Sequence, residues 1–324
     1  MSETEPRRNE WSIGWREVVV VLFVSVIGVA LLSPKVQQTV NVARESQCKN
    51  NLKQLGLALH NYHEHYGTFP PGTVRSGTEG DDSAYSWHTM LLPFVDQSQW
   101  YRKLSPNTPR SLRQAIQDED VLAIARTSVS GFDCPVSRGA GDVNSDRPLR
   151  SDGQNVFVAS ANYVASNGIT PAGPGIFSLH SRVRIRDVKD GLSNVFMLGE
   201  RASEDVANTG RHGAAVWIGV TGTTARVGLP ADAESTIYGS TLVEIHTGKK
   251  LTGYQGYAPW LGFSSHHVWE NKAPHFLMSD GTVRRINPDI DSRIGSDPSN
   301  IDGWGVYQLL SSRSDGKTIP PGSY

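Results

Sequence analysis

The residues best suited to chemistry lie near the end of a long amphipathic segment, where His60, His63, Glu64 and His65 follow one another closely. In a helix, side chains three or four positions apart share a face, so His60 and His63 could hold a metal ion together. The sequence fixes no third ligand, and a hydrogen-bonded helix end is the interpretation it favours. His60 and His63 are therefore metal candidates only.

The chain contains two cysteines, Cys48 and Cys134. Two are too few for a zinc ribbon or a disulfide scaffold, but they suffice for one bridge. If most of the chain is exported, we expect a Cys48–Cys134 disulfide that ties a helix to the following domain. Two unpaired buried thiols are the alternative.

An acidic segment near the C-terminus is a second metal candidate, with side-chain oxygens that suit calcium. It lacks the alternating oxygen spacing and central glycine of an EF-hand loop, so calcium is expected only as a weak candidate cofactor. The carboxylates concerned are Asp289, Asp291, Asp297 and Asp302.

Motifs of the common catalytic classes are missing from the sequence. It has no P-loop and no GxGxxG turn, and the segment 262–266 lacks the glycine that would complete a nucleophile elbow. Lys plus Arg (31) nearly balances Asp plus Glu (32), which argues against recruitment of nucleic acid. We expect no enzymatic activity and no nucleic-acid partner.

The strongest positional signal is the apolar run from Val18 to Leu32. It is slightly short for a membrane span, and Trp11 and Trp15 before it suit the headgroup region. We expect a cytoplasmic stub at residues 1–12, a transmembrane helix at 13–34 and an exported domain at 35–324. This arrangement makes a single-pass protein of the inner membrane. A cleaved signal peptide and a buried helix of a soluble protein are the alternatives.

The helix is predicted to continue to about residue 66, because apolar residues recur every three or four positions from Cys48 onward. Gly67 fits the helix C-cap, and two prolines follow shortly. Beyond it, short apolar runs between turn residues predict strands, with a tight hairpin at Asp280-Gly281. The expected fold class is α+β, with the long N-terminal helix packed on an antiparallel, β-rich domain. A further helix is predicted over residues 111–126.

Several blocks of the chain resemble a large bacterial family of pseudopilin-like proteins with a prepilin-type N-terminus and domain of unknown function 1559. The similarity spans nearly the whole chain. The matching blocks are residues 43–63, 67–72, 86–88, 91–94, 132–135, 162–164, 187–194, 199–200 and 276–283. The resemblance implies a pilin-like fold, in which a protruding helix lies against a sheet, and no established enzymatic activity.

Two positions depart from the family pattern. Ser12 stands where the family has a glycine before the cleaved bond, which speaks against cleavage and methylation by a prepilin peptidase. Twelve residues separate His267 from Asp280-Gly281, where the family's H-X9-DG pattern has nine.

These observations predict a membrane-anchored, pseudopilin-like structural or assembly protein. Its expected partners are the membrane and other pseudopilin-like subunits, or secretion or pilus machinery. The alternative is a tethered extracytoplasmic module that binds a solute or glycan through tryptophan-rich loops. The tryptophans considered are Trp87, Trp100, Trp217, Trp260 and Trp269.

Overall fold

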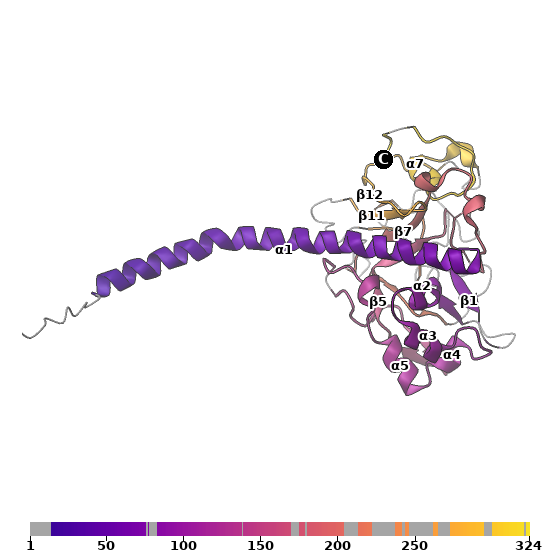
Figure 1. Ribbon diagram of the computed structural model, residues 1–324, viewed down its shortest axis with the longest axis horizontal. Helices are drawn as coiled ribbons and strands as arrows, with labels where there is room; N and C mark the ends of the chain where they lie inside the picture. The colour runs from indigo at the N-terminus through magenta and orange to yellow at the C-terminus, as the bar shows by residue number, and fades with distance from the viewer. Residues whose placement is uncertain are drawn as a thin grey trace, which may run out of the picture. The chain divides into compact units, whose positions relative to one another are not determined.

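The structure is a computed structural model of the 324-residue chain (Figure 1). It describes residues 14–75, 77, 83–137, 139–169, 175–178, 180–203, 213–221, 237–241, 244–245, 262–264, 273–294, 300–320 and 322–324, without the side chains of 26–38. The chain forms two compact units, residues 1–44 and residues 45–324, and each is described by itself.

Helix α1 spans Trp15–Tyr66 and contributes residues to both units. In the second unit its apolar stripe is buried, as the three-and-four spacing predicts. The stripe consists of Cys48, Leu52, Leu55 and Leu59. The helix ends at Gly67, whose φ of 73° and N–H bond to the carbonyl of His63 (2.7 Å) form a C-terminal cap.

The first unit contains the N-terminal part of α1, where the side chains of Val18–Val24 are between 46% and 66% exposed. No helix in the described part of the chain is long and apolar enough to cross a membrane, so the span expected at residues 13–34 is not supported. Residue 13, and within that span the side chains of 26–34, lie outside the described residues.

The main sheet of the second unit has the strand order β10-β6-β7-β11-β12. The bounds are Tyr238–Gly239 (β10), Tyr163–Ser166 (β6), Phe196–Glu200 (β7), His275–Met278 (β11) and Val283–Arg285 (β12). All neighbours pair antiparallel except β10 and β6, which are parallel. The predicted hairpin at Asp280-Gly281 is confirmed: it joins β11 and β12, and Gly281 has a φ of 83°.

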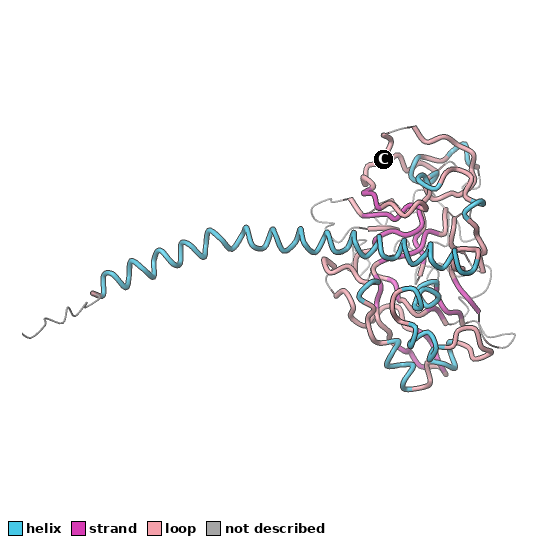
Figure 2. Tube along the Cα trace, in the orientation of Figure 1, coloured by secondary structure: helices cyan, strands magenta, loops and turns pink. Residues whose placement is uncertain are grey.

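Three smaller sheets complete the strand inventory of the described residues. Strands β1 (Thr73–Arg75), β2 (Ala84–Ser86) and β9 (Gly219–Val220) form one sheet, β3 (Leu149–Ser151) and β4 (Gln154–Val156) the next, and β5 (Ser160–Ala161) and β8 (Ala215–Val216) the last. Much of the remaining described chain is loop (Figure 2). The mixed α+β class with antiparallel sheets is thus confirmed.

Short helices and turns surround the sheets. They are α2 (Trp87–Leu91), η1 (Leu92–Phe94), α3 (Ser98–Leu104), α4 (Leu112–Ala115), α5 (Glu119–Ala125), η2 (Ser130–Phe132), η3 (Ile185–Asp187), η4 (Leu192–Asn194), η8 (Ile301–Gly303) and α7 (Val306–Leu309).

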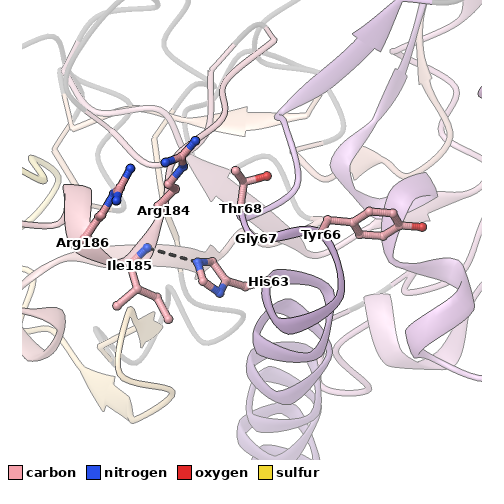
Figure 3. A pocket seen from close by; sticks show the side chains of 7 residues that line it. All are labelled: His63, Tyr66, Gly67, Thr68, Arg184, Ile185 and Arg186. Carbon is pink, nitrogen blue, oxygen red and sulfur yellow. Dashed lines mark hydrogen bonds between the residues drawn. The ribbon is translucent and has the colours of Figure 1, made fainter.

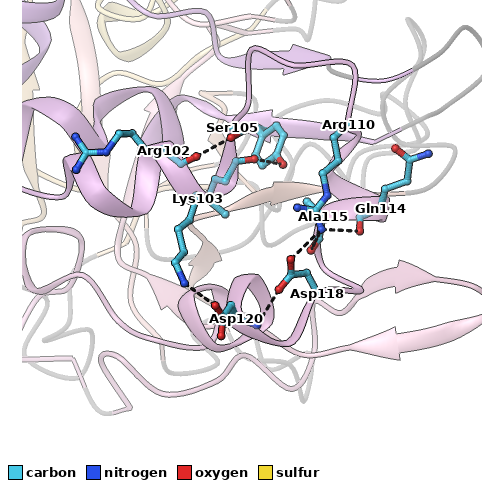
Figure 4. Close-up of polar contacts among 10 residues, drawn as sticks. Arg102, Lys103, Ser105, Arg110, Gln114, Ala115, Asp118 and Asp120 are labelled. Atoms are coloured by element: carbon cyan, nitrogen blue, oxygen red, sulfur yellow. Dashed lines mark hydrogen bonds and ion pairs between the residues drawn. The ribbon is translucent and has the colours of Figure 1, made fainter.

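The segment 111–126, expected to be one helix, forms two helices, α4 and α5, because each has its own N-cap. Ser111 forms a capping box with Gln114, and Asp118 caps α5 by accepting the N–H of Asp120. Exposed ion pairs lie beside these helices; in one of them, Nζ of Lys103 lies 2.5 Å from a carboxylate oxygen of Asp120 (Figure 4). Such solvent-exposed pairs contribute little to stability.

The main sheet is buried on both faces. On β6, Tyr163 and Ala165 belong to the apolar core that includes the α1 stripe, whereas Val164 belongs to a second core. The second core also contains Tyr307 of α7. The alternation of side chains along the strand therefore places α1 and α7 on opposite faces of the sheet.

Candidate functional site

A disulfide between Cys48 and Cys134 joins α1 to the loop after η2. The two Cα atoms are 4.8 Å apart, 86 positions separate the cysteines, and each is about 1% exposed. The bridge predicted from the sequence is therefore present, and no free thiol accompanies it. It is the centre of a buried polar network, here called the disulfide hub.

Strand β6 and the residue before it supply two side chains to the hub. The hydroxyl of Tyr163 donates to the carbonyl of Cys48 (3.0 Å), and the amide oxygen of Asn162 accepts the N–H of Cys134 (3.1 Å). The Asn162 amide nitrogen also donates to the carbonyl of Arg201 (3.0 Å) and to the hydroxyl of Ser203 (3.0 Å). Each half of the disulfide is thus held from the sheet as well as by its own segment.

Helix α1 makes a second connection to the same loop through Asn51. Its amide nitrogen donates to the carbonyls of Asp133 (2.8 Å) and Ser130 (3.2 Å). The side chain of Asp133 is buried beside Ser128, and this burial raises the pKa of its carboxyl to about 6. The contacts of Asn51 and the disulfide therefore hold consecutive turns of α1 on one loop.

His88 packs next to the hub and is fully buried. Its ring stacks on Trp87 (3.7 Å between centroids) and meets Phe132 edge-on (4.7 Å), while Nε2 donates to the carbonyl of Tyr163 (3.0 Å). Burial lowers the pKa of His88 to about 3, so the imidazole is neutral at ordinary pH. A buried neutral histidine with one satisfied donor acts in packing.

Glu200, at the end of β7, lies next to the disulfide and is 2% exposed. One of its carboxylate oxygens accepts the backbone N–H of His275 (2.8 Å), and the other faces Nδ1 of the same residue (3.0 Å). Antiparallel pairing of β7 with β11 brings the two residues together, because Gly199 lies opposite Phe276.

Arg285 determines which ring nitrogen of His275 carries the proton. Its Nε–H donates to Nε2 of His275 (3.0 Å), so Nε2 is the acceptor and the ring proton resides on Nδ1, where it is donated to Glu200. The same guanidinium pairs with Glu45 of α1. A chain of polar contacts therefore runs from the surface of α1 to the buried carboxylate.

His60 and His63 share a helix face, but they belong to no group of three candidate metal ligands among the described residues. His63 Nε2 accepts the N–H of Ile185 (3.2 Å), and burial, followed by the neighbouring His60, lowers its pKa. Both rings lie against Phe69. Within the described residues, the one group of three candidate metal ligands is Cys48, Cys134 and Glu200, which includes neither histidine. His266 and His267 lie outside the described residues.

The acidic segment also forms no group of candidate metal ligands among the residues that the structure describes. Asp291 pairs with Arg293 (2.7 and 2.8 Å), and Asp302 pairs with Lys317 (2.6 Å). Asp289 is exposed, and Asp297 lies outside the described residues. Asp291 and Asp302 are thus engaged with side-chain cations.

An open pocket of about 560 Å³ lies at the end of α1 (Figure 3). The helix end and the segment around η3 line it together, with two exposed arginines on one side. The lining residues are His63, Tyr66, Gly67, Thr68, Arg184, Ile185 and Arg186. No local sequence pattern points to this pocket, because its two walls are more than 100 positions apart.

One known protein family matches most of the chain. Residues 37–293 match a family described as a protein of unknown function, DUF1559. The chain belongs to the DUF1559 family. Comparisons with curated proteins and with solved structures found no match. The DUF1559 match contains the whole disulfide hub, Glu200, His275, Arg285 and both walls of the pocket.

The tryptophans proposed for a binding groove have other roles in this DUF1559 chain, as far as the structure describes them. Trp87 and Trp217 are fully buried in the core, and Trp100 packs against it. Trp260 and Trp269 lie outside the described residues. The burial of Trp87 and Trp217 follows from their place in the folded core and not from any feature of the local sequence.

Proposed function

We propose that this DUF1559 protein is a non-catalytic structural or assembly protein, pseudopilin-like in organisation, with its N-terminal helix as a membrane anchor and its second unit extracytoplasmic. The observation that carries the proposal is the buried network that fixes α1. Cys48, Asn51, Cys134, Asn162 and Tyr163 meet in one buried network that holds α1, and none of them lines the open pocket.

The N-terminal part of α1 supports the anchoring role. Its described apolar side chains, Val18–Val24, are 46–66% exposed within the structure, and the sequence continues apolar to Leu32. Contact with a bilayer or with similar helices would remove these exposed apolar side chains from water. The disulfide supports an oxidising location outside the cytoplasm.

Fractionation of cells that express the full chain tests this proposal. We expect the protein to sediment with membranes and to need detergent for release. Leu22→Arg should move it toward the soluble fraction, because arginine at the centre of a span costs about 2.5–3.5 kcal/mol, which is on the order of a hundredfold in partitioning. Leu57→Arg is the matched control, since Leu57 is 64% exposed on the same helix and Leu22 is 60% exposed.

The proposal fails if the wild-type chain is soluble without detergent. It also fails if Leu22→Arg and Leu57→Arg remain equally bound to membranes. Gel migration with and without reductant, after thiols have been blocked in intact cells, gives an independent measure of compartment. A reduced Cys48–Cys134 pair there would contradict the extracytoplasmic location.

The second candidate function, a tethered module that binds a solute or glycan, has one observation in its favour. The lining of the pocket at the end of α1 includes Arg184 and Arg186 together with Tyr66 and Ile185. Thermal shifts with oligosaccharides and carboxylated sugars would detect such binding. Saturable shifts lost in the Arg184→Ala/Arg186→Ala variant, but kept in Arg182→Ala, would favour this function over the structural one.

A further inference from the structure

Three buried groups with metal-binding chemistry converge at the disulfide hub. The sulfur atoms of Cys48 and Cys134 and a carboxylate oxygen of Glu200 all lie within 4.8 Å of one another, and the three residues are 1%, 1% and 2% exposed. They come from α1, from the loop after η2 and from the end of β7. In the disulfide the sulfurs are bonded to each other, and thiolates rather than disulfides are strong ligands.

Reduction converts this arrangement into a set of three ligands. A dithiol reductant supplies two electrons and two protons: its own thiols become a disulfide, the Cys48–Cys134 bond breaks, and two protein thiols form. When a divalent cation binds, both thiol protons leave to solvent, and each sulfur donates an electron pair to the metal. Thiolate ligands favour zinc and similar thiophilic ions.

The carboxylate of Glu200 is held in the way that a metal ligand requires. His275 contacts both of its oxygens, through its backbone N–H (2.8 Å) and through Nδ1–H (3.0 Å), and Arg285 fixes the ring tautomer. Such outer contacts orient a ligand and raise metal affinity.

Burial couples deprotonation of the cysteines to metal binding. Two thiolates and a carboxylate at these separations place three negative charges away from water, so the buried thiols stay protonated until a cation compensates the charge. A divalent cation bound among them neutralises two of the three charges, and the guanidinium of Arg285 lies beyond His275. A tetrahedral zinc site needs its sulfurs about 3.7 Å apart, which side-chain rotation provides once the disulfide bond is broken.

We propose that the reduced protein binds zinc, or another thiophilic divalent cation, through Cys48, Cys134 and Glu200, and that formation of the disulfide excludes the ion. The site has three protein ligands, which leaves a fourth position for water. Metal and disulfide are alternative links between α1 and the loop at Cys134. The proposal does not depend on the function proposed above.

Cobalt(II) tests the site in the full chain, because cobalt–thiolate bonds give intense near-ultraviolet absorption that histidine and carboxylate ligands do not give. The protein is reduced with a phosphine, which takes an oxygen from water as it is oxidised, and is titrated with cobalt. We expect saturable bands at one ion per chain that zinc abolishes. The untreated, oxidised protein should give none. Zinc should also raise the melting temperature of the reduced protein and leave that of the oxidised protein unchanged.

Glu200→Gln should weaken cobalt affinity roughly 10–100-fold. Glu119→Gln is the matched control, since Glu119 is exposed on α5. Circular dichroism of the reduced wild-type protein accompanies each titration. The proposal is overturned if the reduced, native protein gives no thiolate bands, if bands appear only after native dichroism is lost, or if Glu200→Gln binds as tightly as Glu119→Gln.

Discussion

Two buried titratable groups next to the disulfide hub should respond to acid in opposite directions. Burial lowers the pKa of His88 from 6.5 to about 3. The unfolded chain therefore takes up a proton near pH 6.5, whereas the folded protein resists it. The stability that neutral His88 contributes is present above pH 6.5 and is lost as the pH falls through the window from 6.5 to about 3.

Asp133 behaves in the opposite way. Burial raises the pKa of its carboxyl from 3.8 to about 6, against the hydrogen bonds from Ser128 and Gly141. The folded protein therefore binds the proton first as the pH falls. The free-energy penalty of the ionised carboxylate is present above pH 6 and is relieved as the pH falls from about 6 to 3.8.

These shifts give magnitudes for acidification from pH 7 to about pH 4. With about 1.4 kcal/mol for each pKa unit, His88 loses about 3 kcal/mol of stability over this interval, and Asp133 regains about 2 kcal/mol. The net loss from the pair in the wild type is about 1 kcal/mol. Asp133→Asn removes the compensating group, so the variant should lose about 3 kcal/mol.

Urea unfolding of the oxidised protein at pH 7 and pH 4 measures these losses. The asparagine at 133 retains an oxygen to accept the bonds from Ser128 and Gly141. Asp289→Asn is the matched control, because Asp289 is exposed and its variant removes the same charge. Equal losses for the 133 and 289 variants would refute the reasoning about Asp133. A loss of less than about 1 kcal/mol in Asp133→Asn would refute the reasoning about His88.

Two further predictions concern the hub and the sheet. Replacement of both Cys48 and Cys134 by alanine should lower the free energy of unfolding by about 4–5 kcal/mol, because the bridge closes a loop of 86 positions in the unfolded chain. Urea unfolding measures this loss. A loss under about 1 kcal/mol would contradict the stabilising role of the bridge. Gly199→Ala should lower the free energy of unfolding by about 1–3 kcal/mol, because a Cβ there would lie 2.3 Å from the ring of Phe263. Gly131→Ala is the control, because a Cβ at Gly131 meets nothing within 4 Å. Equal melting temperatures for the two variants would contradict this packing.

The parts of the fold that could be predicted from the sequence depend on local patterns. The apolar stripe of α1, its end at Gly67 and the hairpin at Asp280-Gly281 each follow from residues within a few positions of one another. The disulfide followed from the count of cysteines. In each case the chemistry of the local residues leaves few alternatives.

The partners of Glu200 could not be predicted in this way. By proximity in sequence alone, Arg201 would be the natural partner of Glu200. In the structure, Arg201 donates to backbone carbonyls, including that of Gly262 (3.0 Å), and Glu200 faces His275. The register between β7 and β11 creates that contact across 75 positions, and no local pattern encodes a strand register.

The short helices α2 and α3 were also missed, for a physical reason. Helix α2 has five residues and α3 has seven, so neither completes the two turns over which a 3.6-residue period can be recognised. Tertiary contacts stabilise α2 instead: Thr89 donates to the carbonyl of Ile218 (2.8 Å), and Trp87 is fully buried. Such elements form because of the surrounding core rather than their own propensity.

The arrangement of the hub indicates which substitutions should affect stability and which should affect function. Asn51, Asn162 and Tyr163 each use side-chain groups to satisfy backbone groups of the disulfide segments, and all are buried. The amide and hydroxyl groups of these three residues cannot also bind a ligand without breaking those pairings, at about 1–3 kcal/mol for each unsatisfied group. Substitutions of Asn51, Asn162 and Tyr163 should therefore report on stability, and substitutions on the exposed face of α1 and around the pocket at its end should report on function.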